Sequence, residues 1–255
     1  DNAALCALDY LVNYCGVPWS RIDTAMAQAA VAACNESVPT TAGTQKRYVV
    51  GGVLASDVQP RDNLKTLFDA MAGDGCFSAG KWRIWAGTYS APVATLDEDD
   101  FGDGDLTIVP RASRQDIFNS VRGQYRDPRP PNNYQLTDFP PYRSATYVDV
   151  DGQEYWEDLD FPLTQDIEAV QRLAKLNLFR SRLSLTFRAT YNLGAYRFQP
   201  GDTVRIKIKR YGWDTIDGGL GKVFRVVERE FTPPSASQVG KVELTLQEEA
   251  QAVYA

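Results

Sequence analysis

The sequence predicts an α+β protein in which a small α/β domain is followed by a mostly antiparallel, barrel-like β domain with one packed helix. In the first third of the chain, apolar residues recur at the spacing of amphipathic helices. From about residue 105 they alternate with polar residues at the period of a half-buried strand. The 255 residues exceed the usual size of one domain. We therefore expect one domain over 1–104 and another over 105–255.

The first domain is expected to contain three helices and two strands. A helix over 1–15 ends before Gly16, and a second helix over 20–34 has Ser20 as its expected N-cap. The remaining expected elements are a loop over 36–46, a strand over 47–56, a helix from near Pro60 to Gly73, and a strand over 81–87.

The second domain is expected to be rich in strands that are separated by Gly, Pro, Asp and Asn turns. The clearest alternation runs over 183–191, where Phe187 and Tyr191 share one face. One helix interrupts the strands, and Thr164 is its expected cap. Residues 127–143 carry five prolines and are expected to form an excursion over the surface. The other expected strands are 106–110, 118–127, 144–150, 202–210, 221–230 and 241–247.

Composition excludes several classes of function. The chain has no histidine, which removes Ser-His-Asp and Cys-His catalysis and any imidazole ligand for zinc or iron. A net charge of −6 disfavours nucleic acid and anionic membranes as partners of the whole chain. No apolar run is long enough for a membrane span. The four cysteines lack paired metal or redox spacing, so we expect reduced thiols and no cofactor. The chain opens with Asp1 directly at a helix pattern, so we also expect it to be a piece of a longer polypeptide.

Two acidic segments are candidates for chemistry. Residues 95–105 resemble a calcium loop in composition but place Phe101 where an oxygen ligand is required, so we expect a solvated turn and no metal site. Residues 149–160 combine carboxylates with Tyr155 and Trp156, as a sugar-binding cleft does. Asp151-Gly152 in that segment instead predicts a two-residue hairpin turn.

A third candidate is a basic row on one predicted strand. Val204, Ile206 and Ile208 are expected to face a core, and period two then sends Arg205, Lys207 and Lys209 to the opposite side. No aromatic residue lies between these cations, so the stacking partners of a single-strand binder are missing. We expect a protein interface, and the expected partners of these three cations are Glu228, Glu230 and Glu243.

The order of segments resembles the hub and tip-attachment proteins at the distal end of long phage tails, the family of the lambda-type tip protein. The segments that carry the resemblance follow one another over nearly the whole chain. They are NAALCALDYLVNYCGV, RYVVGGVLASDVQPRDNLKTLFDAMAG, GKWRIWAG, the acidic turn, IFNSVRGQYRDP, VDGQEYWEDLDFPLTQDIEAVQRLAKLNLFRSR, QPGDTVRIKI and KVELTLQEEAQAVY.

This resemblance implies a structural, non-enzymatic hub that closes the tail tube as a homotrimer and takes part in host attachment and DNA ejection. It implies the distal tail protein and the tape-measure protein as partners, with DNA only in transit. It also implies a place at the tail tip of the virion, and in the host cytoplasm during assembly. The alternatives are a cell-wall-directed glycoside hydrolase and a carbohydrate-binding β-module using Tyr155, Trp156 or Trp213.

Overall fold

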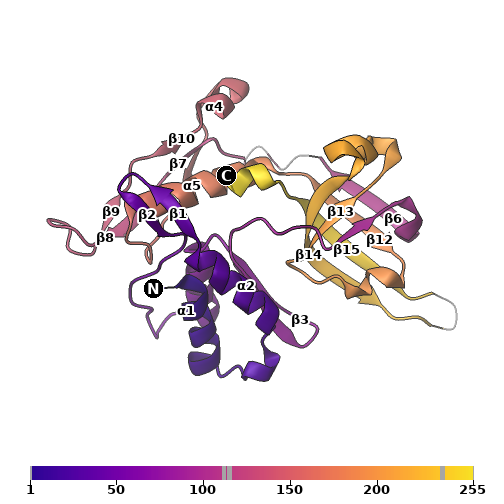
Figure 1. Ribbon diagram of the computed structural model, residues 1–255, viewed down its shortest axis with the longest axis horizontal. Coiled ribbons are helices and arrows are strands. Elements are labelled where there is room, and N and C mark those ends of the chain that lie inside the picture. Colours follow the sequence, from indigo (N-terminus) through magenta and orange to yellow (C-terminus); the bar gives the residue numbers. More distant parts are fainter. Residues whose placement is uncertain (1, 111–112, 114–116, 236–238, 255) are drawn as a thin grey trace. The chain divides into compact units, whose positions relative to one another are not determined.

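The computed structural model describes residues 2–110, 113, 117–235 and 239–254. The chain forms two compact units, and each unit is built from two separate stretches of sequence (Figure 1). Unit 1 comprises Asp1–Thr88 and Ile117–Arg182, and unit 2 comprises Tyr89–Asp116 and Leu183–Ala255. This division differs from the predicted domains 1–104 and 105–255. The predicted boundary between residues 104 and 105 falls inside one continuous strand, β6 (Phe101–Val109). The helix expected in the second domain lies in unit 1.

Three α-helices begin unit 1, as the sequence predicts. Helix α1 (Ala3–Asp9) continues into a π-helical turn (Tyr10–Tyr14), α2 spans Thr24–Asn35, and α3 (Pro60–Asp69) has its proline in the first turn. The cap of α2 is Asp23, whose carboxylate accepts from the Met26 amide at 3.2 Å. The predicted cap Ser20 is wrong, because Ile22 adopts an extended conformation and pairs with Trp82 before the helix begins.

Two hairpins complete the first stretch of unit 1. Residues 36–46 form the antiparallel pair β1 (Ser37–Thr40) and β2 (Gly43–Lys46), where the sequence predicted a loop. The predicted strand 47–56 is absent from the described elements apart from a bridge between Val49 and Asn2. The predicted strand 81–87 is confirmed as β4 (Lys81–Trp85), which pairs with β3 (Asp74–Ser78).

The second stretch of unit 1 combines short strands with two helices. A three-stranded sheet has the order β10-β7-β11, and a separate hairpin joins β8 to β9. Strand β9 and the loop before it lie in the predicted Pro-rich excursion 127–143, whereas β8 precedes it except for Asp127. Their bounds are β7 Ser120–Arg122, β8 Gln124–Asp127, β9 Gln135–Asp138, β10 Tyr142–Arg143 and β11 Trp156–Asp158.

Helix α4 (Ala145–Asp151) stands where the sequence predicted a strand over 144–150. Gly152 ends this helix in the left-handed conformation (φ 76°), and its amide donates to the Val148 carbonyl at 2.8 Å. The predicted hairpin turn at Asp151-Gly152 is therefore wrong. Among the described residues of this helix only Val148 is buried, and Val150 is exposed. The alternation of Val148 and Val150 therefore did not mark the buried face of a strand.

Helix α5 (Ile167–Arg182) is the long helix of unit 1. It buries an apolar stripe that includes Val170, Leu173 and Leu178. The carboxylate of Asp166 accepts from the Ala169 amide at 2.9 Å, so Asp166 caps the helix, and Thr164 does not.

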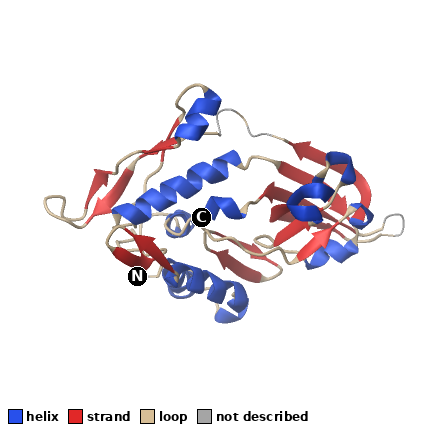
Figure 2. Ribbon diagram, turned by 45° about the horizontal axis from the view of Figure 1, so that its top comes forward, coloured by secondary structure: helices blue, strands red, loops and turns tan. Residues whose placement is uncertain are grey.

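Unit 2 is built on one six-stranded sheet with the order β5-β13-β14-β15-β12-β6. All neighbours are antiparallel except β5 and β13, and the strands bend in Figure 2. Its interior face buries Phe187, Tyr191, Phe224 and Leu244 completely. The remaining bounds are β5 Ala94–Leu96, β12 Thr186–Tyr191, β13 Thr203–Ile206, β14 Lys222–Thr232 and β15 Lys241–Glu248.

The connection between the two edge strands forces this sheet to curl. Strands β5 and β6 lie at opposite edges, yet only residues 97–100 join them. In a flat sheet with strands ~4.8 Å apart, the outer strands would be about 24 Å apart. The link from Leu96 to Phe101 spans at most roughly 17 Å when fully extended. The sheet therefore forms a half-barrel, which confirms the predicted α+β class with a barrel-like β portion.

Gly104 allows β6 to lie close to β12. A Cβ atom at this position would be 2.4 Å from Thr190 Oγ1 and 2.7 Å from Thr190 Cβ. The register between the two strands also shifts between Ala189 and Tyr191.

We expect Gly104→Ala to lower the free energy of unfolding of unit 2 by about 1–3 kcal/mol. Urea denaturation measures this change, and Asp105→Ala, at the exposed next position of the same strand, is the control. Equal stability of Gly104→Ala and the parent would contradict the close approach.

Candidate protein-interaction surfaces

The predicted basic row is only partly preserved in the structure. Val204, Ile206 and Ile208 are buried, as predicted. Strand β13 ends at Ile206, however, and Lys209 lies in a 3-10 turn, where its amide donates to a Glu98 carboxylate oxygen at 2.9 Å. The three cations therefore do not stand on one continuous strand.

Arg205 has an acidic partner that the sequence did not predict. Its guanidinium lies 2.9 Å from Asp217, and its side chain is only 18% exposed. The predicted partners Glu228, Glu230 and Glu243 are wrong for this arginine, because β13 pairs with β14 only from Lys222 to Arg225.

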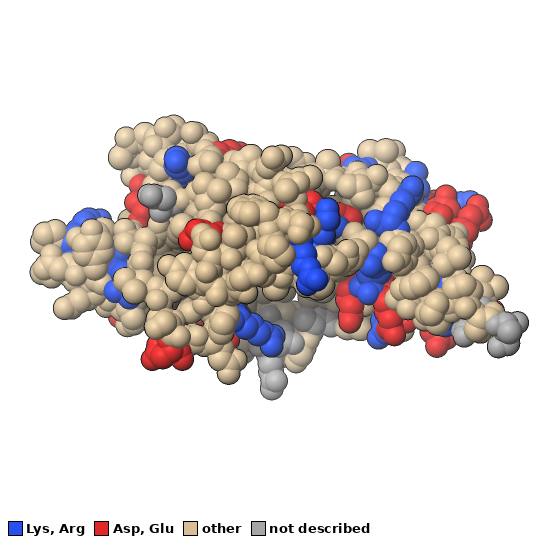
Figure 3. Space-filling model, turned by 90° about the horizontal axis from the view of Figure 1, so that it is seen from below, with Lys and Arg blue, Asp and Glu red and all other residues tan. Residues whose placement is uncertain are grey.

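The predicted glutamates lie around a different arginine. Glu243 and Glu230 form ion pairs with Arg188 on β12. Ion pairs such as these connect neighbouring strands of one sheet. In the face of the molecule shown in Figure 3, basic and acidic side chains lie close together. A mixed surface of this kind does not provide the single-sign field that binds nucleic acid.

The first acidic segment forms the corner that links the two edge strands of the half-barrel, β5 and β6. Asp97 accepts from the Asp99 amide at 3.0 Å, and Asp100 accepts from the Asp97 amide at 3.1 Å. The Asp100 carbonyl accepts from the Asn192 amide at 3.1 Å, which ties the corner to the end of β12. Within the described residues, no three His, Cys, Asp or Glu side chains gather in an arrangement that could hold a metal ion. These carboxylates therefore act in turn formation.

The carboxylates of the second acidic segment have partners within unit 1. Glu154 lies 2.7 Å from Arg143 and accepts from the Trp156 indole at 3.1 Å. The hydrogen bond from Arg122 lowers the pKa of Asp158, whereas a glycosidase acid needs a raised pKa. Asp160 accepts from the Gln124 amide at 2.8 Å. The arrangement suits a structural surface better than a pair of catalytic carboxyl groups.

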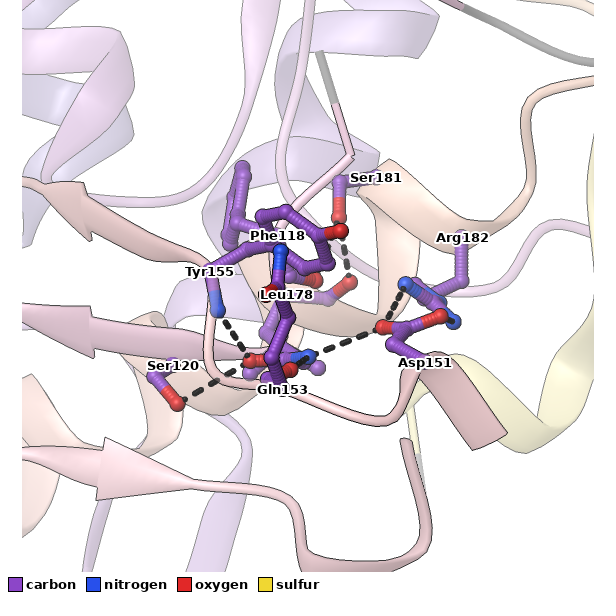
Figure 4. Close-up of polar contacts among 9 residues, drawn as sticks. Phe118, Ser120, Asp151, Gln153, Tyr155, Leu178, Ser181 and Arg182 are labelled. Atoms are coloured by element: carbon purple, nitrogen blue, oxygen red, sulfur yellow. Dashed lines mark hydrogen bonds and ion pairs between the residues drawn. The ribbon is translucent and has the colours of Figure 1, made fainter. Parts of the chain in front are cut away.

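A polar cluster joins this segment to α5, and Figure 4 labels Asp151, Gln153, Tyr155 and Arg182 of it. Asn119 is its fully buried member and contacts three of these residues. The Asn119 amide group donates to Asp151 at 2.8 Å and to the Gln153 carbonyl at 2.9 Å. Its oxygen accepts from the Tyr155 amide at 2.8 Å. Asp151 in turn receives two bonds from the Arg182 guanidinium, at 2.8 and 2.9 Å. The cluster holds the segment from α4 to β11 against the C-terminal end of α5, and sequence reasoning missed it because its members are far apart in the chain.

Unit 1 also carries an apolar groove of about 870 Å³. Four large apolar residues at the groove are exposed in the described chain, a feature that no sequence pattern indicated. They are Leu5 (51% exposed), Tyr14 (76%), Val53 (90%) and Val58 (41%). Cys6 and Asp9 also line it. Exposed apolar residues gathered around one hollow are typical of an interaction site.

Cysteine chemistry does not supply an obvious site. The four cysteines, all in the described part of the chain, form no disulfide. Burial raises the pKa of the Cys34 thiol to about 11, which makes it a poor nucleophile at neutral pH.

In the described residues no helix is both long and apolar enough to cross a membrane.

Comparisons with known proteins agree with a role in phage tails. The family described as "Putative phage tail protein" matches residues 59–228, which is more than half of the chain. No curated protein matches.

Three solved structures match this chain, two of them with TM-scores above 0.5. A chain from "Virion of native gene transfer agent (GTA) particle" has a TM-score of 0.62 at 17% identity, over 96% of this chain and 52% of that one. A tail protein from Neisseria meningitidis MC58 has a TM-score of 0.53 at 18% identity, over 80% and 60%. A 43 kDa tail protein of prophage MuSo2 from Shewanella oneidensis has a TM-score of 0.45 at 11% identity, over 76% and 54%.

This chain thus spans only about half of the gene transfer agent chain and 60% of the Neisseria chain. At these identities the structural likeness establishes the fold, while the family match over residues 59–228 establishes the family. The chain belongs to this family of phage tail proteins.

Proposed function

We propose that this chain is part of a hub at the distal end of the tail, where a homotrimer of the full-length protein closes the tail tube. The observation that carries the proposal is the half-barrel of unit 2, in a chain of the phage tail family. A curled sheet with two open edges is suited to form part of a larger ring wall. Host attachment and DNA ejection follow from that position at the tip of the virion.

The partners in this proposal are the distal tail protein, the tape-measure protein and DNA in transit, and assembly takes place in the host cytoplasm. The ring would join two different patches at each junction, as rings of three or more copies do. Arg205, Lys207 and Lys209 remain candidate interface residues. Lys209 is exposed and Lys207 half-buried, whereas the ion pair with Asp217 assigns Arg205 mainly to unit 2 itself.

The hub is proposed to have no enzymatic activity. The supporting observations are the absence of histidine and the partners found for Glu154, Asp158 and Asp160. A cell-wall hydrolase would clear a suspension of bacterial walls, so a turbidity assay separates the two functions. We expect no clearing; clearing that is lost in Glu154→Gln or Asp158→Asn would support the hydrolase instead.

Light scattering on the full-length protein tests the ring. We expect a homotrimer at micromolar concentration. A stable dimer, or a monomer at every concentration, would contradict the proposed hub.

We expect no specific binding of DNA to the basic residues of unit 2. Three cations neutralise few phosphates against a net charge of −6, and Arg205 is already paired. A gel-shift titration at ~50 mM and ~200 mM salt should show no binding for the parent or for a variant with Arg205, Lys207 and Lys209 changed to Gln. Micromolar, salt-sensitive binding that disappears in the variant would overturn the protein-facing interpretation of these residues.

A further inference from the structure

The loop between β8 and β9, residues 128–134, is held in one conformation by a buried carboxylate. Asp127 is only 5% exposed and accepts from the Arg129 amide at 3.1 Å and the Arg129 guanidinium at 2.8 and 3.2 Å. It also accepts from the Asn132 side chain at 3.0 Å. The hydrogen bonds from Arg129 hold the pKa of Asp127 well below its usual range. Because the folded pKa is lowered, the stability that ionised Asp127 contributes is fully present at neutral pH. It declines as the pH falls below the ordinary pKa of an aspartate and is gone below the lowered value.

The same loop orients an aromatic side chain toward solvent. The Tyr134 amide donates to the Asp127 carbonyl at 2.7 Å, and the Tyr134 carbonyl accepts from Arg126 at 2.8 Å. Asn133 and Tyr134 both have positive φ, at 46° and 68°, which is unfavourable for residues with a side chain. Despite this cost, the Tyr134 side chain is 54% exposed, and nearby Leu136 is 48% exposed. Figure 1 shows the β8–β9 hairpin projecting from the rest of unit 1.

A pre-ordered loop that exposes Tyr and Leu has the properties of a binding anchor. Aromatic anchors dominate many protein interfaces, and ordering the loop beforehand lowers the entropy lost on association. The loop also carries positive charge: Arg126 and Arg129 flank Asp127, which leaves residues 126–136 with a net charge of +1, and the Arg129 side chain is 59% exposed. A fitting partner surface is therefore an apolar hollow beside a carboxylate.

The groove of unit 1 has these complementary features. Its walls are mostly apolar. Asp9 is the one acidic residue among the described residues that line it, and this exposed side chain accepts from the neutral side chain of Asn13 at 2.6 Å. Tyr10 and Tyr14 stack with ring centroids 5.4 Å apart along the same surface. The volume of about 870 Å³ exceeds the space that one tyrosine side chain needs. The buried part of the wall includes Val50, Leu67 and Leu163.

We propose that the β8–β9 loop of one copy inserts Tyr134 and Leu136 into the apolar groove beside Asp9 of a neighbouring copy. Every copy carries both the loop and the groove, so a contact between these two different patches can repeat from copy to copy and close a ring. The inference rests on the proposed hub, because it assigns residues to the junctions of that ring. The net positive charge of residues 126–136 lies at the edge of the contact, where Asp9 of the neighbouring copy complements it.

Cys6 allows a direct test, because this native thiol lines the groove. The full-length protein with Tyr134→Cys is treated with a short bismaleimide, and intermolecular products are separated from intramolecular ones by mass. We expect a product of two chains joined through residue 134 and Cys6, identified by peptide mass spectrometry. The product should be absent when Cys6→Ser is added. The matched control is Val150→Cys, which presents a thiol at another site of unit 1 that is 74% exposed in the parent.

A second variant separates association from folding. Glycine adopts the positive φ of Tyr134 without strain, so Tyr134→Gly preserves the loop and removes the ring. We expect unchanged or higher thermal stability together with a self-association constant weaker by about tenfold or more. Val150→Gly is the control for an exposed residue outside the contact, and its self-association should match that of the parent.

The possible outcomes distinguish the inference from the hub. Suppose that the parent is a homotrimer, that no cross-link forms between residue 134 and Cys6, and that the Tyr134→Gly variant self-associates as strongly as the parent. This result would overturn the loop-in-groove contact and leave the hub intact. A specific 134–6 product in a dimer would support the contact and contradict the trimeric hub. A protein that remains monomeric and forms no product would overturn both.

Discussion

Replacing Asn119 with alanine is expected to destabilise unit 1 by roughly 2–4 kcal/mol, since each buried polar group left without a partner costs about 1–3 kcal/mol. The side chain is fully buried, and its loss removes the partners of the Tyr155 amide and the Gln153 carbonyl. Asp151 loses one donor but keeps Arg182, which limits the effect.

Urea denaturation measures the change, and hydrogen exchange identifies which unit opens, because two units need not unfold together. Asn13→Ala is the matched control. Asn13 is exposed and donates to exposed Asp9, so its loss should change stability by less than about 0.5 kcal/mol. A cost for Asn119→Ala no larger than that of the control would show that the cluster does not hold the segment from α4 to β11 in place.

Phe187→Ala is expected to destabilise unit 2 by about 3–5 kcal/mol, the usual cost of removing a fully buried aromatic ring. The Phe187 side chain is 0% exposed, and its ring centroid lies 5.5 Å from that of Trp213, 6.0 Å from Phe224 and 6.1 Å from Phe101. These residues come from β12, β14, β6 and the segment after β13, so the ring connects most of the half-barrel.

Phe231→Ala serves as the control for this core substitution. Phe231 is 41% exposed and packs on Tyr196 with centroids 4.8 Å apart, so we expect a cost below about 1 kcal/mol. Thermal unfolding followed by near-ultraviolet circular dichroism measures both variants. Similar losses for the two phenylalanines would contradict a single core centred on Phe187.

The elements with strong local signals were predictable. Strand β12 alternates apolar and polar residues in sequence and buries its aromatic residues, although Thr190 on the polar face is buried too. Helix α3 combines an initial proline with an apolar stripe. Short segments were less predictable. Residues 144–150 contain alternating valines typical of a strand, but Gly152 can end a helix as readily as it can form a hairpin, and the helix is what forms.

At the candidate site, the sequence predicted only which side chains of a single strand are buried. The burial of Val204 and Ile206 follows from period two, but the partner of Arg205 does not, since Asp217 reaches it from a later turn. The polar cluster at Asn119 and the groove beside α1 depend on contacts between distant segments. Neither leaves a pattern in the local sequence.

Electron microscopy of assembled particles tests the central claim most directly. An epitope tag is placed on the full-length protein, the tagged particles must remain infectious or competent for transfer, and antibody marks the tag. The hub account predicts label only at the distal tip of the tail, around a ring with threefold symmetry. Label along the tube or at the head, or particles that lack the protein, would contradict it.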